Sequence, residues 1–285
     1  MSEVTLESQL FDIIQDKEMS EEIKLAKIDM LIRLGVDVNT SDCAKSVLML
    51  ANEVKEEKIA KFLEEKGAKE FFDEKRAKEL GEELIKECIK NEINFEKVKE
   101  LISKGADIEA KSGWKEETLL MMASLYGRSN VVKLLLEKGA NIEAKNNDGS
   151  TSLILASSNG KSEVVKLLLE KGADIEAKNV DGETSLMYAS LSGHTEVVKM
   201  LLEKGANIEA KNKLGRNSLM WASKWGYSDV VKILLENRAD IEAKDKKGKT
   251  ALDWADNDEI KKILEDARNK NSFLYKVKKG FGIGD

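Results

Sequence analysis

The chain has 285 residues, of which 35% are charged and 41% are hydrophobic, and its formal net charge is −6. It has no run of about 18 apolar residues, which excludes a membrane-spanning helix. The negative net charge argues against a nucleic-acid partner, which calls for a basic face, and weakly favours a neutral or basic protein as the partner. The opening sequence MSEVTLESQLFD carries acids where a secretory signal carries bases. We therefore expect a cytoplasmic protein, with export that needs no such signal as the alternative.

The composition also bears on loops, cysteine chemistry and source. The chain has no proline, so its loops must take their shape from Gly, Asn and Asp. The two cysteines, Cys43 and Cys88, form no motif with each other, and we expect both to be buried thiols in a reducing compartment. The frequent use of Lys, Glu and Asn, with no proline, favours a bacterial source.

Residues 1–104 show three pairs of helical patterns. The first helix of each pair is predicted over Leu6–Ile14, about Ala44–Val54 and about Glu74–Lys90. A second apolar helical pattern follows each first helix, and a glycine comes after it at Gly35, Gly67 and Gly105. This rhythm favours three divergent copies of one helix-pair unit, the first acting as a cap. A separate helical domain is the alternative.

From Gly105 onward, one phrase recurs at nearly constant spacing. GADIEAK begins at Gly105, and close copies begin at Gly139, Gly172, Gly205 and Arg238. The last four copies stand 33 residues apart. A fixed period of this length identifies a repeat array.

One unit, residues 179–211, divides into a turn and two helices. Thr184 is placed to cap the first helix, and Gly193 separates this helix from the second, which Thr195 is predicted to cap. Gly205 is expected to end the second helix in the left-handed conformation. The two short helices carry more apolar surface than they can bury alone, so such units must stack on their neighbours.

The pattern D-x-x-G-x-T-x-L-x-x-A, followed by G-H, V-V-x-L-L-L and G-A-x-I, resembles the ankyrin repeat, and the match is strong over Gly105–Ala267. The resemblance implies L-shaped units whose turn tips and first helices form a concave groove that holds partners. The chain departs from the family's T-P-L-H sequence, which becomes Thr151-Ser152-Leu153-Ile154, Thr184-Ser185-Leu186-Met187 and Asn217-Ser218-Leu219-Met220. We interpret this as a variant of the fold in which proline no longer preorganises the first helical turn.

The expected fold is therefore all-α: an ankyrin-repeat solenoid of about seven to eight helix-turn-helix units with hairpin-like turns. Residues 1–104 are predicted to be divergent ankyrin-like repeats with an N-terminal cap. Residues 105–270 are predicted to be well-matched repeats, closed by a polar C-terminal cap whose second helix covers Asp258–Ala267.

Residues 271–285 form a predicted C-terminal tail that mixes apolar and lysine side chains. The tail can fold back on the repeats, stay disordered or reach a partner. Contact with an anionic membrane is a further alternative that we do not expect, because one short segment anchors poorly alone.

The sequence offers no set of residues for catalysis. The only histidine, His194, stands at the G-H position, where the resemblance implies a structural role. Neither cysteine has a histidine partner, and no Cys/His cluster has zinc spacing. We expect no catalytic residue, no cofactor and no metal site; an enzyme within residues 1–104 is the alternative.

Positions that vary between copies and face the groove are free to recognise a partner. They lie beside the turn glycine and at the end of the first helix, where a solvated surface would carry Glu, Lys and Asn. Many of them are apolar or aromatic instead, and such residues mark contact surfaces and binding hot spots. The predicted groove residues are Trp114, Leu125, Tyr126, Val180, Leu191, Leu214, Lys224 and Trp225.

Other large side chains of the first helices are expected to serve the fold. Tyr188 and Trp221 should pack in part against their neighbours, and Met121, Met187 and Met220 should lie in the core. The sequence thus predicts a monomeric, non-catalytic protein–protein interaction module, with self-association through the groove left open. The alternative is an adaptor or exported effector that uses its C-terminal tail for targeting.

Overall fold

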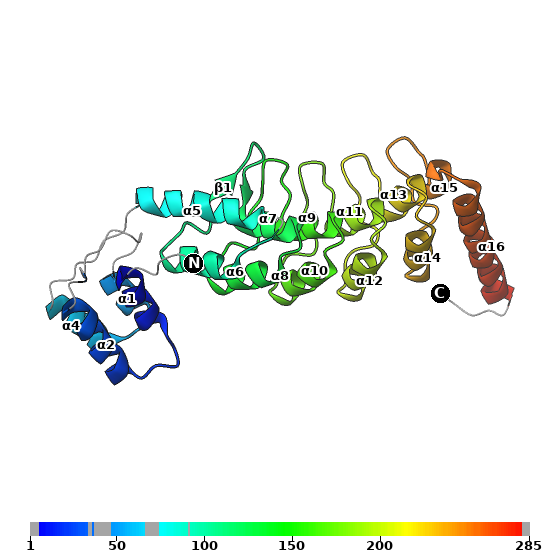
Figure 1. Cartoon of the computed structure of the whole chain (residues 1–285). Helices are drawn as coiled ribbons and strands as arrows, with labels where there is room; N and C mark the ends of the chain where they lie inside the picture. The colour runs from blue at the N-terminus through cyan, green and yellow to red at the C-terminus, as the bar shows by residue number, and fades with distance from the viewer. Residues whose placement is uncertain (1–5, 34–35, 37–46, 66–73, 91, 281–285) are drawn as a thin grey trace. The chain divides into compact units, whose positions relative to one another are not determined.

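The computed structural model describes residues 6–33, 36, 47–65, 74–90 and 92–280 (Figure 1). The chain divides into two compact units, Met1–Ser112 and Gly113–Asp285, which we call unit 1 and unit 2. The division falls a few residues after residue 104, where the sequence predicts the change from divergent to well-matched repeats.

Unit 1 holds three helix pairs among its described residues. They are α1 (Leu6–Gln15) with α2 (Glu21–Arg33), α3 (Val47–Glu53) with α4 (Glu57–Glu65), and α5 (Glu74–Cys88) with α6 (Phe95–Ser103); the strand β1 (Lys111–Ser112) follows. The predicted pairs of helices are confirmed, although residues 44–46 of the predicted second pair lie outside the described residues. Leu10, Phe11, Ile28 and Leu63 are buried together and join three of these helices in one core.

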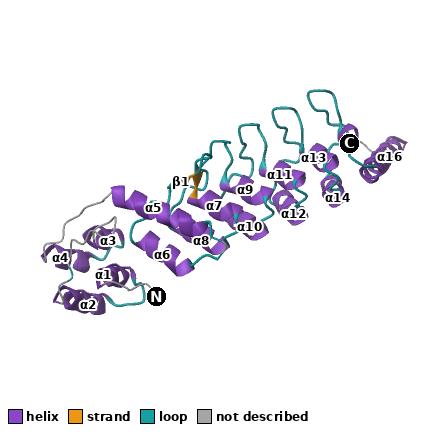
Figure 2. Ribbon diagram, turned by 45° about the horizontal axis from the view of Figure 1, so that its top comes forward, coloured by secondary structure: helices purple, strands orange, loops and turns teal. Residues whose placement is uncertain are grey.

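Unit 2 holds five helix pairs among its described residues, and the strand β2 (Glu117–Thr118) precedes them. The pairs are α7 (Leu119–Leu125) with α8 (Ser129–Glu137), α9 (Ser152–Ser158) with α10 (Ser162–Glu170), α11 (Ser185–Leu191) with α12 (Thr195–Glu203), α13 (Ser218–Lys224) with α14 (Ser228–Glu236), and α15 (Ala251–Trp254) with α16 (Asp258–Gly280). Each helix contacts the equivalent helix of the next pair, so first helices form one row and second helices another. Long turns project on one side of these rows (Figure 2). An all-α solenoid is therefore confirmed.

The repeat over residues 179–211 shows why these residues fold in this way. The Thr184 hydroxyl accepts a hydrogen bond from the Met187 N–H over 3.4 Å, so Thr184 caps α11 as predicted. Gly205, with a φ of +89°, follows the end of α12. The predicted core methionines are confirmed, because the side chains of Met121, Met187 and Met220 are buried.

The predicted cap of the second helix is wrong. α12 begins at Thr195, which leaves His194 in the capping position without a side-chain capping bond. The Thr195 hydroxyl donates instead to the Gly193 carbonyl oxygen over 3.4 Å. The second helix of this repeat therefore starts one residue earlier than the capping pattern predicts.

The last helix is longer than predicted. α16 runs through Gly280, whereas the sequence pattern predicts a helix over residues 258–267 followed by a separate tail. Residues 268–279 contain no proline or glycine, the two residues least favourable in a helix interior. Most of the predicted tail is thus helical backbone, and residues 281–285 lie outside the described residues.

Candidate protein-binding surface

The turns between repeats are built around one polar side chain each. In the turn before α11, Asn179 Oδ1 accepts hydrogen bonds from the backbone N–H groups of Asp181 and Glu183, at 3.0 and 2.9 Å. Asn146, Asn212 and Asp245 make the same pair of bonds in their own turns. A local side chain therefore sets the shape of each of these four turns.

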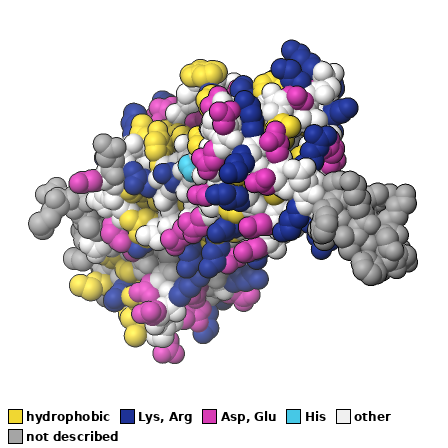
Figure 3. All heavy atoms as spheres, turned by 90° about the vertical axis from the view of Figure 1, so that its right-hand side faces the viewer, with side chains coloured by type: hydrophobic (Ala, Val, Ile, Leu, Met, Phe, Trp, Pro, Cys, Tyr) yellow, Lys and Arg dark blue, Asp and Glu magenta, His cyan; other side chains and the backbone are white. Residues whose placement is uncertain are grey.

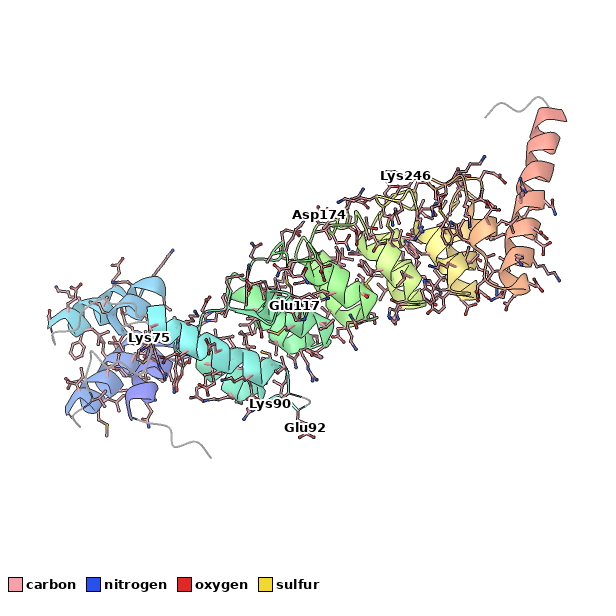
Figure 4. The ribbon with its side chains drawn as sticks, turned by 90° about the horizontal axis from the view of Figure 1, so that it is seen from above. Lys75, Lys90, Glu92, Glu117, Asp174 and Lys246 are labelled. Atoms are coloured by element: carbon pink, nitrogen blue, oxygen red, sulfur yellow. The ribbon has the colours of Figure 1, made fainter. Side chains whose placement is uncertain are left out.

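Neighbouring turns are also joined to one another. The Val180 N–H donates to the Asp148 carbonyl oxygen over 2.9 Å, and the Lys213 N–H donates to that of Asp181 over 2.8 Å. The equivalent bonds join Asn147 to Lys115 and Lys246 to Leu214. This ladder holds the turns in one row, seen from above in Figure 4, which labels Lys246 in the last turn.

We call the turn face the surface formed by the turns at residues 113–116, 145–150, 178–183, 211–216 and 244–249 together with the C-terminal ends of the first helices. Five of the predicted groove residues are exposed on it. Their exposed fractions are 79% for Trp114, 46% for Tyr126, 50% for Val180, 52% for Leu214 and 53% for Trp225. The turns and the helix ends both contribute to this set.

The other three predicted groove residues are half-buried. Leu191 packs against a buried cluster of Met187, Ala210 and Trp221, so this leucine serves the packing between two repeats. Leu125 and Lys224 are likewise only partly accessible. Tyr126 and Trp225, which directly follow α7 and α13, are thus more exposed than Leu125 and Lys224, the last residues of these helices.

Aromatic rings and cations gather at the C-terminal half of the turn face. The Lys224 ammonium lies 5.3, 5.5 and 5.4 Å from the ring centroids of Trp221, Trp225 and Trp254. The Arg216 guanidinium lies 5.0 Å from the Trp221 ring and 4.3 Å from the Trp254 ring. We call this set, completed by Lys249 at 5.1 Å from Trp254, the tryptophan–cation cluster.

Trp254 and Arg216 are members that the sequence reasoning missed. The available signal is the aromatic residue that stands nine positions after the polar turn residue in three successive repeats: Tyr188, Trp221 and Trp254. Each lies near its own turn, and Tyr188 accepts a hydrogen bond from the Asn179 side-chain amide over 3.0 Å. Burial and the nearby Glu183 carboxylate raise the pKa of Tyr188 to about 12.

The Asp245 carboxylate is satisfied within its own repeat. Burial opposes its ionisation, yet hydrogen bonds from the backbone N–H groups of Lys249 and Lys247 and from the Trp254 indole, with the Arg216 charge nearby, hold the pKa of Asp245 below its ordinary value. This acid therefore stays charged while its oxygens are already engaged.

The only histidine contacts the preceding repeat. His194 Nε2 lies 3.0 Å from the Ser158 carbonyl oxygen, which ties the ring to the preceding repeat. The part of the chain that the structure describes contains no group of three His, Cys, Asp or Glu residues that could hold a metal ion. No helix among the described residues is both long and apolar enough to cross a membrane.

A separate hollow of about 1000 Å³ lies between the C-terminal end of α14, the segment that follows it and the middle of α16. Arg238, Glu242 and Arg268 are among its lining residues, and the last two form an ion pair at 2.7 Å. The hollow shares no lining residue with the turn face.

The comparison with known families agrees with this architecture. The family model for ankyrin repeats (3 copies) matches four overlapping stretches of the chain, residues 85–179, 120–212, 177–245 and 211–272. No curated protein matches the chain. Ankyrin repeats are generally protein–protein interaction modules and are typically non-catalytic. Because the matched stretches cover more than half of its residues, the chain belongs to the ankyrin-repeat family.

Proposed function

We propose that the protein is a non-catalytic binding module that holds a partner protein on the turn face of unit 2, between Trp114 and Lys247. One observation carries the proposal. Over residues 113–270, whose side chains the structure describes, every large hydrophobic side chain that is exposed lies on the turn face: Trp114, Tyr126, Val180, Leu214 and Trp225. The outer sides of the second helices α8, α10, α12 and α14 expose none.

The chemistry of these five side chains suits a protein partner. Burying exposed apolar surface is favourable at roughly 25 cal/mol per Å². Tryptophan and tyrosine are the types most enriched among residues that dominate binding free energy. Contiguous apolar groups on a protein surface usually mark a contact site.

The backbone around these side chains suits binding as well. The Val180 and Leu214 turns are held by side-chain and inter-repeat hydrogen bonds, so little backbone ordering remains to be done when a partner arrives. A preorganised surface loses less conformational entropy on binding, and more of the contact energy appears as affinity.

Affinity capture from a lysate of the source cell, followed by mass spectrometry, tests the proposal. The bait is the intact chain beside the triple variant Tyr126→Ala, Leu214→Ser, Trp225→Ala, with circular dichroism to establish that both are folded. Leu191 is left unchanged because it is half-buried and packs against a buried cluster. We expect a protein that the intact chain retains and the variant loses.

A matched control removes exposed apolar groups elsewhere. Ile23, Met30 and Ile89 of unit 1 are exposed to a similar degree, so the variant Ile23→Ser, Met30→Ser, Ile89→Ser should retain the same partner. A partner kept by the turn-face variant and lost by this control would place binding in unit 1 and contradict the proposal.

A further inference from the structure

Charge is distributed unevenly along the turn face. The turn at residues 178–184 carries one basic and two acidic side chains, and that at 145–151 carries one of each. The turn at 211–217 carries three basic and no acidic side chains, and that at 244–250 carries four basic and one acidic. In a chain of net charge −6, the two C-terminal turns therefore form a basic region.

Six cations of this region are in no ion pair with a carboxylate of the described part of the chain. Among the residues that the structure describes, no ion pair is formed by Lys213, Arg216, Lys224, Lys246, Lys247 or Lys249. At the N-terminal end of the same face, by contrast, Lys115 pairs with Asp148 over 2.9 Å. In Figure 3, Lys and Arg side chains stand at the upper right edge of the molecule, beside hydrophobic and acidic side chains, and others are spread over the rest of this face.

The tryptophan–cation cluster orients part of this charge without neutralising it. Lys224 and Arg216 lie over indole rings, and a cation over a ring keeps its full charge and its N–H donors. The Asp245 carboxylate, which has the Arg216 charge nearby, already accepts hydrogen bonds from its own turn and from Trp254. The charged N–H donors of the cluster thus lie beside the exposed Trp225 ring and the exposed Leu214 side chain.

We propose that the C-terminal half of the turn face, from Lys213 to Trp254, binds an acidic protein segment that places Asp or Glu carboxylates on these cations and an apolar side chain against Trp225 and Leu214. This inference rests on the proposed function and names the chemistry of the partner. Carboxylates form charge-assisted hydrogen bonds with Arg and Lys, which are about twice as strong as neutral ones. The matching charges also steer the partner to this half of the face.

The surroundings favour an acidic peptide over a nucleic acid. A phosphate backbone needs a long basic track, whereas here the basic region spans two turns and the next turn carries Asp181 and Glu183. The apolar groups Val180 and Leu214 stand at the tips of neighbouring turns, where a phosphate chain would pass. A short segment with few carboxylates and an apolar anchor fits both features.

A peptide selection with the full-length protein tests the inference. The probe is a displayed library of random peptides of about 12 residues, which reach roughly 40 Å when extended. We expect the enriched peptides to combine Asp or Glu with an aromatic or aliphatic residue. Their affinity, measured by fluorescence anisotropy on synthetic copies, should fall as salt rises from about 0.1 to 0.5 M.

Two charge variants make the measurement specific to this surface. Lys224→Glu with Lys249→Glu should weaken binding of the selected peptides by about tenfold or more. Lys166→Glu with Lys199→Glu makes the same change of net charge on exposed positions of the second helices α10 and α12, and should leave the affinity within about twofold. Equal weakening by both variants would show a nonspecific effect of net charge and overturn the inference.

The remaining outcomes separate this inference from the proposed function. Enriched peptides without acidic residues that lose affinity with Trp225→Ala would leave the binding face in place and overturn the acidic partner. Peptides indifferent to Trp225→Ala and to both charge variants, or no enriched peptide at all, would count against the turn face itself. Displacement of the peptide by a single-stranded oligonucleotide of about 20 nucleotides at similar affinity would assign the region to nucleic acid instead.

Discussion

Trp254 donates its indole N–H to the Asp245 carboxylate over 3.2 Å, and this pair occurs in the only described turn of unit 2 that replaces the usual asparagine with an acid. In the repeat at 179–211, Tyr188 stands at the place of Trp254, and its hydroxyl can accept a bond from an asparagine amide. An indole N–H can only donate. Trp221, which follows Asn212, accordingly has no acceptor for its buried indole N–H among the described residues.

The variant Asp245→Asn should test this match between acid and indole. Asparagine keeps the oxygen that accepts from the Lys247 and Lys249 N–H groups, but it turns an amide donor or a weaker acceptor toward Trp254. We expect the free energy of unfolding at pH 7 to fall by about 1–2 kcal/mol, as for loss of a hydrogen bond to a charged group. Urea denaturation followed by tryptophan fluorescence measures it.

The same pair predicts how the difference depends on pH. The pKa of Asp245 is lower in the folded protein than its ordinary value of 3.8. Its stabilising effect is therefore fully present well above pH 3.8 and is lost as the pH falls through the folded pKa. The free energies of unfolding of the original protein and of Asp245→Asn should converge in acid. A difference that stays constant down to pH 2 would contradict this assignment.

Trp221 and Trp225 should respond differently to truncation, although both belong to the tryptophan–cation cluster. Trp221 is only 9% exposed, so Trp221→Ala should lower the free energy of unfolding by about 3–5 kcal/mol. Trp225→Ala should cost less than about 1 kcal/mol of stability, yet weaken partner binding by about 2 kcal/mol. Thermal unfolding and binding titrations together check this. Equal losses of thermal stability would show that Trp225 is a packing residue.

Arg238 adopts a backbone conformation that favours glycine. Its φ is +66°, and it stands 33 residues after Gly205, whose φ is +89°. A residue other than glycine in the left-handed region costs roughly 1–2 kcal/mol of stability. Glycine removes this cost, but it loses more conformational entropy on folding, which offsets part of the gain. Arg238→Gly should therefore raise the free energy of unfolding by about 0.5–1 kcal/mol.

Gly205→Ala is the matched control for that substitution. A Cβ at Gly205 would meet no atom within 4 Å, so the variant measures backbone strain alone. It should lower the free energy of unfolding by about 1 kcal/mol. If Arg238→Gly and Gly205→Ala change the free energy of unfolding in the same direction, then the backbone conformation that favours glycine does not explain the effect at Arg238.

His194 should limit what fits at Gly160 in the preceding repeat. A Cβ on Gly160 would lie 2.6 Å from His194 Nδ1, while the same addition at Gly139 would meet nothing within 4 Å. Both glycines have positive φ, so they share the backbone strain. Gly160→Ala should therefore destabilise the protein by at least about 1 kcal/mol more than Gly139→Ala.

A double-mutant cycle shows whether the imidazole is the cause. In a His194→Ala background the excess cost of Gly160→Ala should disappear, because the ring that the methyl group meets is gone. The excess would persist if the neighbouring backbone were the obstacle. The cycle also tests whether His194, the only histidine, has the structural role that its contact with the Ser158 carbonyl oxygen indicates.

The repeat period, the helix pairs and the position of each turn could be predicted from the sequence alone. They depend on local chemistry: Thr184 caps the helix that follows it, Gly205 takes the left-handed conformation, and apolar residues recur on one side of each helix. The exposure of Trp114 and Trp225 could also be predicted, because Trp114 lies in a turn and Trp225 directly follows a first helix.

The tertiary structure alone decided which of these side chains meet. Leu191 is half-buried because Ala210 and Trp221 of the adjoining segments cover it, and Trp254 joins Lys224 from a turn and helix about 30 residues away. Whether the cations at 211–217 and 244–250 find carboxylates likewise depends on distances between stacked repeats. A sequence pattern with a period of 33 fixes what each repeat looks like, but contacts between repeats arise only when their surfaces pack.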